Sequence, residues 1–159
     1  MAQGTIAFAN YGPFGLDAKV TLLDGTGVGA GFTAQLYYGQ PGTPVQSLQP
    51  LFPTTRFSSD PPEDRGYVLP LEIPVPGTQE GDRQTFVLRV YNGPAWEASS
   101  FRGESNPVTV SLNGGVLPTA YLVGLQPFHV VPIPEPSVFA LEVLGGCLLV
   151  LLRKTRRHA

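Results

Sequence analysis

Cysteine and histidine are scarce in this chain of 159 residues. The single cysteine, Cys147, can form neither an internal disulfide nor a thiolate metal cluster. The two histidines, His129 and His158, stand toward the C-terminus, and the sequence contains no G-x-S-x-G motif that would present a nucleophilic serine. We therefore expect no cofactor, no metal site and no enzymatic activity.

Charged residues are also few, at 14% of the chain, and the formal net charge is -2 at pH 7. The densest positive charge stands at the extreme C-terminus, so the rest of the chain has no extended basic surface for phosphate groups. We expect no nucleic-acid partner.

Glycine and proline are abundant, with 19 and 17 residues, and this composition favours short strands joined by many turns. Apolar residues alternate with polar ones in 84–93, where Phe86 and Leu88 fall on one face. The same alternation occurs in 32–39 and in 106–115, which ends in an Asn-Gly-Gly turn. We expect a half-buried strand in each stretch.

Four further stretches predict shorter strands: 5–10, 19–23, 67–73 and 120–124. Pro70 indicates that the third is an edge strand or contains a bulge. Six prolines between residues 40 and 65 predict a long extended connection.

About seven short strands, with no amphipathic helix before residue 137, predict a mainly β domain over residues 1–126. The expected architecture is an antiparallel β-sandwich of the immunoglobulin-like or jelly-roll-like kind.

Gly25, Gly27 and Ala30 stand at the spacing of G-x-G-x-x-A. In nucleotide-binding proteins this pattern brings backbone amides against a pyrophosphate at the start of a helix. Here a strand is predicted next, and Asp24 followed by glycine is typical of a tight turn. We expect a glycine-rich hairpin loop.

Acidic residues form two groups, Asp60 with Glu63 and Asp64, and Glu80 with Asp82. Paired carboxylates serve glycosidases, and carboxylate clusters bind calcium. Both groups stand in loops rich in proline or glycine, and neither has the D-x-D-x-D-G spacing of a calcium loop. Solvated loop charge is the favoured interpretation.

Aromatic side chains offer flat faces on which sugar rings can stack. Trp96 is the strongest candidate for a glycan contact, because it falls in a predicted loop beside Asn92 and Glu97. The other aromatic residues considered are Tyr11, Tyr37, Tyr38, Tyr67, Tyr91 and Phe101. Aromatic residues on alternating strands usually fill the core, which is the favoured interpretation of the set.

The C-terminal segment differs in character from the rest of the chain. Four prolines predict an extended linker over 127–137. Residues 138–152 are apolar except for Glu142, and as a helix they would span about 22 Å, against roughly 30 Å for the hydrocarbon core of a bilayer. Ser137 is a suitable N-cap for this helix. We predict a short transmembrane helix over 138–152.

The last residues, 153–159, form a basic tail that we expect in the cytoplasm. Four of them are typical of a stop-transfer flank: Arg153, Lys154, Arg156 and Arg157. The β domain would then lie across the membrane. A helix docked on the β domain is the alternative, but such a helix should have a polar face, and 138–152 is apolar nearly all round.

Pro134, Glu135 and Pro136 are followed by Ser137, by an apolar segment with paired glycines and by an arginine-rich terminus. This order resembles the PEP-CTERM sorting signal of exported bacterial proteins. The resemblance implies a substrate of an exosortase, a membrane-embedded cysteine transpeptidase that cleaves near the P-E-P motif and passes the protein to the cell surface or matrix. Many proteins of this family accompany exopolysaccharide loci.

The part of the chain before this C-terminal segment is similar to β-rich exported proteins of this class from Verrucomicrobia-like bacteria. The likeness lies in the stretches GTIAFAN, VTLLDGTGVGAGFTAQLYYG and SNPVTVSLNGG, and it brings no known activity. Proteins of this class begin with a signal peptide, whereas MAQGTIAFANYG has neither a basic start nor an apolar run. The letters AQG resemble the start of a chain from which a signal peptide has been cleaved. We therefore expect a signal segment upstream of Met1.

These features predict an exported, non-enzymatic surface or extracellular-matrix protein that is first anchored in the inner membrane. The expected partners are an exosortase, membrane lipid around residues 138–152, and exopolysaccharide. The alternative function is a membrane-tethered module that binds exopolysaccharide through Trp96. A third function, a hydrolase that uses Asp60 or Asp64, is the least favoured.

Overall fold

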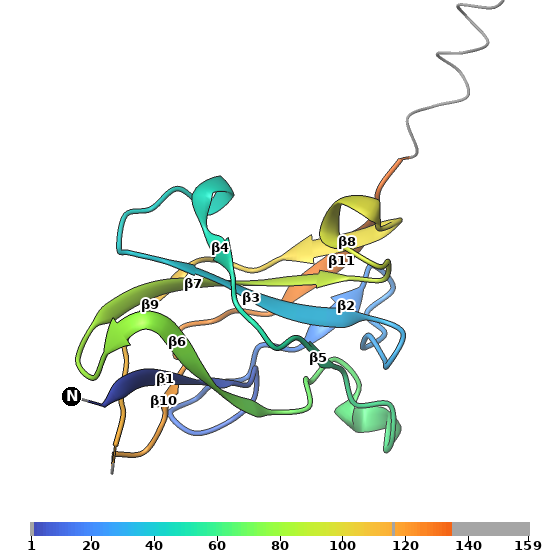
Figure 1. The fold of residues 1–159 in the computed structure, drawn as a ribbon. Coiled ribbons are helices and arrows are strands. Elements are labelled where there is room, and N and C mark those ends of the chain that lie inside the picture. Colours follow the sequence, from blue (N-terminus) through green and yellow to red (C-terminus); the bar gives the residue numbers. More distant parts are fainter. Residues whose placement is uncertain (1, 116, 135–159) are drawn as a thin grey trace, which may run out of the picture.

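A computed structural model describes residues 2–115 and 117–134, and their backbone is mainly β (Figure 1). The longer strands are β1 (Gln3–Phe8), β3 (Thr33–Gly39), β6 (Leu71–Gln79), β7 (Arg83–Tyr91) and β11 (Phe128–Pro132). The shorter strands are β2 (Val20–Leu22), β4 (Gln49–Pro50), β5 (Thr55–Arg56), β8 (Phe101–Glu104), β9 (Val108–Ser111) and β10 (Ala120–Tyr121). Short 3-10 turns occur at η1 (Val45–Ser47), η2 (Pro62–Asp64) and η3 (Trp96–Ala98).

The strands form two sheets. In the smaller sheet β1 lies between β10 and β6, and in the larger sheet the order is β2-β11-β8-β7-β3-β4. In addition, β5 pairs with β3 and β9 pairs with β7. The longest pairing in the larger sheet joins β3 to β7, from Thr33 opposite Tyr91 to Gly39 opposite Thr85. In Figure 1 the smaller sheet lies below the larger one.

Both sheets contribute to one hydrophobic core. Ile6 and Phe8 of the smaller sheet belong to the same buried cluster as Leu36, Phe86 and Leu88 of the larger sheet, and all five are 0% exposed. Burial of each such side chain contributes roughly 1.5–3 kcal/mol. The two sheets therefore stabilise each other through this shared core.

The strands predicted from alternation in 32–39, 84–93 and 106–115 are confirmed as β3, β7 and β9. The predicted inward faces are buried in β7 and partly buried at Phe32, Tyr38 and Val110. The opposite face of β7 is covered as well, because Val87 is 0% exposed and Tyr91 is 5% exposed. β7 has partners along both edges, so it is an interior strand of the larger sheet.

Three of the four weaker strand predictions are confirmed in shortened or shifted form, as β1, β2 and β10. The fourth, 67–73, is wrong over its first half, because β6 begins at Leu71 and continues to Gln79. Within the described chain β6 pairs with β1 alone, and its Pro74 and Pro76 are exposed. An edge strand tolerates such prolines because one side of its backbone needs no ladder partner.

Two strand pairs are parallel, namely β10 with β1 and β11 with β2. The other seven pairs between named strands of the described chain are antiparallel. The prediction of an antiparallel architecture is therefore wrong at two pairs. Alternation shows which face of a strand is buried, but it carries no information on the direction of a distant partner.

The segment predicted as a linker over 127–137 begins inside the fold. β11 lies between β2 and β8, and its Val130 is 1% exposed. Pro127 precedes the strand and Pro132 ends it, so neither proline removes a backbone N–H from its middle. The β-rich part thus extends through residue 132, past the boundary predicted at residue 126.

Pro134 is the last described residue of the chain and is exposed. Residues 135–137, the helix predicted over 138–152 and the basic tail 153–159 lie outside the described residues. Among residues 2–115 and 117–134, no helix has the length and apolar character needed to cross a membrane.

Candidate functional site

Trp96 begins η3 and is half-buried against β7 and β8. The rings of Tyr91 and Trp96 form a T-shaped pair, with centroids 6.3 Å apart and ring planes at 83°. The guanidinium carbons of Arg89 and Arg102 lie 5.0 and 5.3 Å from the indole ring, within the range of cation–π attraction. We call these four residues the tryptophan cluster.

Both arginines of the cluster are paired with carboxylates. Arg89 Nε donates to Glu104 Oε2 at 2.6 Å, and Arg102 donates to Glu97 Oε2 at 3.1 Å. The Arg89 guanidinium carbon also lies 4.2 Å from the centroid of the Tyr37 ring. Neighbouring carboxylates therefore compensate the positive charge of the cluster.

Tyr91 joins the cluster to the sheet beneath it. Its hydroxyl donates to Gln35 Oε1 at 3.1 Å, and burial raises the pKa of Tyr91. Trp96 thus has a structural role, which is to hold η3 on β7 and β8. A sugar stacked on Trp96 would have to share its ring with these neighbours, and the glycan contact predicted there stays a prediction.

The predicted carboxylate groups lie on the surface. Asp60, Glu63 and Asp64 lie in and before η2, Glu80 and Asp82 lie in the turn between β6 and β7, and all five are exposed. Asp82 Oδ2 accepts a hydrogen bond at 2.8 Å from a backbone N–H three residues earlier, which closes its turn. In the described part of the chain, no three His, Cys, Asp or Glu side chains are grouped so that they could hold a metal ion.

The segment with the G-x-G-x-x-A spacing forms a turn, as predicted. Leu22 N–H donates to Thr26 C=O at 2.8 Å, and Gly25 has a φ of 84°. Asp24 Oδ1 accepts a hydrogen bond from Thr26 N–H at 2.8 Å, which lowers the pKa of Asp24. Because β3 is the next regular element, this segment lacks the helix start that a pyrophosphate requires.

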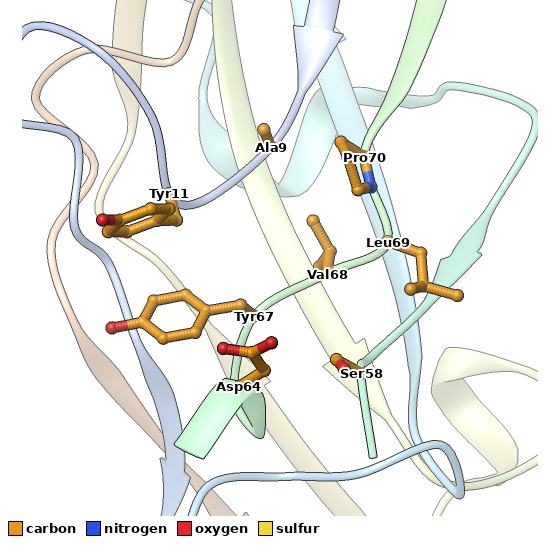
Figure 2. A pocket seen from close by; sticks show the side chains of 8 residues that line it. All are labelled: Ala9, Tyr11, Ser58, Asp64, Tyr67, Val68, Leu69 and Pro70. Atoms are coloured by element: carbon orange, nitrogen blue, oxygen red, sulfur yellow. The ribbon is translucent and has the colours of Figure 1, made fainter. Parts of the chain in front are cut away.

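A pocket of about 550 Å³ opens between the loop after β1 and the loops around η2 (Figure 2). We call it the tyrosine pocket. Its lining residues are Ala9, Tyr11, Ser58, Asp64, Tyr67, Val68, Leu69 and Pro70. Figure 2 shows the two tyrosine rings together on one side, with the Asp64 carboxylate beside Tyr67 and Leu69 on the opposite side.

The two tyrosines of the pocket contact each other, with ring centroids 5.2 Å apart and planes at 58°. Tyr67 is half-buried and its hydroxyl donates to Asp17 Oδ1 at 2.7 Å. Lys19 Nζ lies 5.4 Å from the centroid of the Tyr67 ring. Tyr67 is therefore fixed by its neighbours, whereas Tyr11 is 64% exposed and presents most of its ring to solvent.

Asn10 connects the two parts of the chain that carry these tyrosines, and it is 1% exposed. Its Nδ2 donates to the carbonyls of Ala18 and Gly66, both at 2.8 Å, and its Oδ1 accepts from Val68 N–H at 2.9 Å. A fully satisfied buried network of this kind rigidifies the backbone around it. The spacing of the two rings is thus set by buried polar contacts beneath the surface.

The sequence indicated Tyr11, Tyr67 and Asp64 as separate candidates, but no motif or spacing predicted that they form one site. Asn10 and Gly66, which bring the two loops together, are 56 residues apart. An asparagine at the end of a predicted strand is typical of a turn, and its sequence context gives no sign that this one is buried. The site became visible only in three dimensions.

Tyr67 offers a titration test of the pocket geometry. The hydrogen bond to Asp17 is the main cause that raises the pKa of Tyr67 to about 12, because the phenolate would lie beside a carboxylate. Since the folded pKa exceeds the ordinary value of 10.0, the stability from this contact is present below pH 10 and is lost as the pH rises toward 12. We expect tyrosinate absorbance to show one tyrosine titrating near pH 12.

The matched variants separate this tyrosine from the others. Tyr67→Phe should remove the late titration, and Asp17→Ala should move it back toward pH 10. An unchanged titration curve for Asp17→Ala would show that the carboxylate does not control the Tyr67 hydroxyl.

Comparisons of the chain with protein-family models, with curated proteins and with solved structures found no match. Its function is therefore inferred from its own residues and their geometry.

Proposed function

We propose that this chain is an exported, non-enzymatic protein of the cell surface or extracellular matrix, delivered by a C-terminal sorting signal of the PEP-CTERM type. One observation carries the proposal. The motif Pro134-Glu135-Pro136, the apolar segment 138–152 and the basic tail 153–159 follow one another in this order. A short apolar segment before a cluster of basic residues is typical of a membrane stop signal.

In this proposal the chain passes through an intermediate anchored in the inner membrane. Residues 138–152 contact lipid, and the basic tail stays on the cytoplasmic side. An exosortase then cleaves near residues 134–137 and releases the β-rich part to the surface, where exopolysaccharide is a candidate partner. The span is short, and Glu142 adds a cost within the membrane. Both features favour a transient anchor over a permanent one.

The residues that follow the last strand support a processing site near Pro134. The last strand ends at Pro132, Ile133 N–H donates to Ser100 C=O at 2.7 Å, and Pro134 is exposed. A cut between residues 134 and 137 would remove no strand and no residue of the described core. The β-rich part would keep all its described strand pairs after release.

We also propose that the two sheets form a β-sandwich of the immunoglobulin-like or jelly-roll-like class. The shared core and the predominance of antiparallel pairs support this assignment. The two parallel pairs are compatible with it, because each involves the outermost strand of a sheet, β10 in one and β2 in the other.

The sorting proposal is tested by the C-terminal peptide of the protein in its native host. We expect mass spectrometry of the surface fraction to find chains that end between residues 134 and 137. Glu135→Ala should lower the trimmed fraction by about tenfold or more, because the motif residue would no longer fit the processing enzyme. The matched control, Glu80→Ala, changes an exposed glutamate on the β-rich part and should be trimmed like the unaltered chain.

The basic tail gives a second arm of the same experiment. Replacement of its four arginine and lysine residues by alanine should reduce retention in the membrane before cleavage. A chain that still ends at Ala159 in every fraction, or that stays in the cytoplasm, would contradict the sorting proposal.

The alternative function, binding of exopolysaccharide through Trp96, has weaker support at that residue. Within the tryptophan cluster, two guanidinium groups and the Tyr91 ring already lie against the indole. A hydrolase based on Asp60 or Asp64 stays the least favoured function, because both residues are exposed and, in the described chain, neither belongs to a group of three side chains that could hold a metal ion.

A further inference from the structure

We propose that the tyrosine pocket binds a neutral polysaccharide, with the Tyr11 ring as the stacking face and the Asp64 carboxylate as a hydrogen-bond acceptor for sugar hydroxyls. The inference concerns the described residues alone and does not rest on the sorting proposal. It places a carbohydrate site away from Trp96.

The aromatic surface is the first reason. Tyr11 is 64% exposed although its ring is large and largely apolar, and Leu69 on the other side of the pocket is 52% exposed. A pyranose ring has one face made of C–H groups, whose slight positive charge matches the negative face of an aromatic ring. Stacking on Tyr11 would cover apolar surface that water covers in the free protein.

The polar groups are the second reason. The backbone of Asp64 is engaged in its turn, since its N–H donates to Pro61 C=O at 3.0 Å and its C=O accepts from Tyr67 N–H at 3.1 Å. Its carboxylate stays exposed beside the rings (Figure 2). The hydroxyl of Ser58 lies in the same lining. Hydroxyl groups at the edge of a sugar ring are suitable donors to the carboxylate and to this oxygen.

The charge of the pocket lining favours a neutral sugar. Among the described residues that line the tyrosine pocket, Asp64 is the one that carries a charge, and its charge is negative. Two cations have their own contacts near the pocket: the Lys19 ammonium lies against the Tyr67 ring and donates to Glu63 C=O at 3.2 Å, and Arg65 Nε donates to Ser59 C=O at 3.4 Å. A polysaccharide that carries carboxylate, sulfate or phosphate groups would meet Asp64 with like charge. A neutral chain avoids this repulsion.

Size and rigidity also fit a sugar site. A volume of about 550 Å³ lies within the range of small-ligand pockets and accommodates a sugar unit, while the open surface lets a chain continue past it. Asn10 and Asp17 hold the two loops and the Tyr67 ring in place before any ligand arrives. A preformed site loses little conformational entropy on binding.

Affinity gel electrophoresis of the full chain tests the proposal. The gels contain dextran, hydroxyethylcellulose or galactomannan as neutral probes, and alginate or hyaluronate as acidic probes. A polyoxyethylene detergent keeps the chain soluble, because glucoside and maltoside detergents would compete as sugars. We expect at least one neutral polysaccharide to retard the protein and the two acidic ones to leave its mobility unchanged.

The variants locate the site. Tyr11→Ala should weaken retardation by about tenfold, whereas Tyr11→Phe, which keeps the ring, should stay within about threefold of the unaltered chain. Asp64→Asn should weaken it severalfold, and Trp96→Ala should leave it unchanged. Tyr11 and Asp64 are exposed, so thermal melting should confirm that these variants are folded.

Three outcomes would overturn the proposal. They are absence of retardation by all three neutral polysaccharides, retardation by the acidic ones alone, and retardation that is lost with Trp96→Ala but kept with Tyr11→Ala. Each of these outcomes leaves the sorting proposal intact, because trimming at residues 134–137 is measured independently in the host.

Discussion

Asn10→Ala is expected to lower the free energy of unfolding by about 3 kcal/mol or more. The substitution deletes three hydrogen bonds at a site that is 1% exposed. The Val68 N–H and the Ala18 carbonyl would lose their partner, and an unsatisfied buried polar group costs roughly 1–3 kcal/mol. The Gly66 carbonyl would keep its hydrogen bond from Val20 N–H. Among the variants of a polar side chain considered for this protein, we expect this one to be the most destabilising.

Urea unfolding provides the measurement, with the fluorescence of Trp96, the chain's one tryptophan, as the signal. Asn106→Ala is the matched control. Asn106 also bridges two backbone groups, Gly124 C=O at 3.0 Å and Gln126 N–H at 2.9 Å, but both contacts are exposed. Water can replace its amide, so the expected loss is about 1 kcal/mol or less. Equal losses in the two variants would contradict the role assigned to burial.

Gly66→Ala should destabilise the protein by about 3 kcal/mol or more, for a steric reason. Gly66 has a φ of +92°, and a Cβ atom there would lie 2.5 Å from Val20 O and 2.8 Å from Lys19 Cγ. Val20 N–H donates to Gly66 C=O at 3.0 Å, and Gly66 N–H donates to Val28 C=O at 2.8 Å. The backbone cannot move away from the new methyl group without breaking these hydrogen bonds.

Gly25→Ala separates the cost of the steric clash from the cost of the left-handed backbone. Gly25 has a similar φ of +84°, but a Cβ atom there would meet nothing within 4 Å. It should therefore incur only the cost of the left-handed backbone, about 1–2 kcal/mol. For a chain of this size each 1 kcal/mol lowers the melting temperature by about 2–4 °C, so a thermal scan resolves the difference. A Gly66→Ala variant as stable as Gly25→Ala would show that the loop at Gly66 has room to relax.

Local sequence patterns predicted much of the β structure. Phe86, Leu88 and Val90 recur at every second position, and because strand side chains point to opposite faces, the pattern identified a buried face of β7. It did not predict that Val87 on the other face would be buried. Coverage of that face depends on side chains from other parts of the chain.

Proline was a less reliable guide than alternation. Pro127 and Pro132 suggested a linker, yet Pro127 precedes β11 and Pro132 is its last residue, and Pro74 and Pro76 lie inside β6. A proline is excluded from a strand only where its missing N–H would have been a ladder donor, and that depends on which edge has a partner. The partner is known only when the sheet is assembled.

In the candidate sites, too, local features were predicted and features that depend on distant residues were not. The exposed carboxylates and the turn at Gly25 were predicted correctly, because they follow from residues next to one another in the chain. The tyrosine pocket was not predicted, since Tyr11 and Tyr67 meet through Asn10, which bonds to backbone groups up to 58 residues away.

The sequence by itself determined the β class, the inward faces of the main strands and the glycine turn, and it contains the motif on which the sorting proposal rests. Each of these depends on side-chain periodicity or on a contiguous motif, which short-range chemistry encodes directly. The tertiary structure alone decided the direction of β10 and β11, the half-buried state of Trp96 and the position of the tyrosine pocket. These features depend on which distant segments share the core, and only the balance of buried apolar area and satisfied backbone groups over the whole chain selects them.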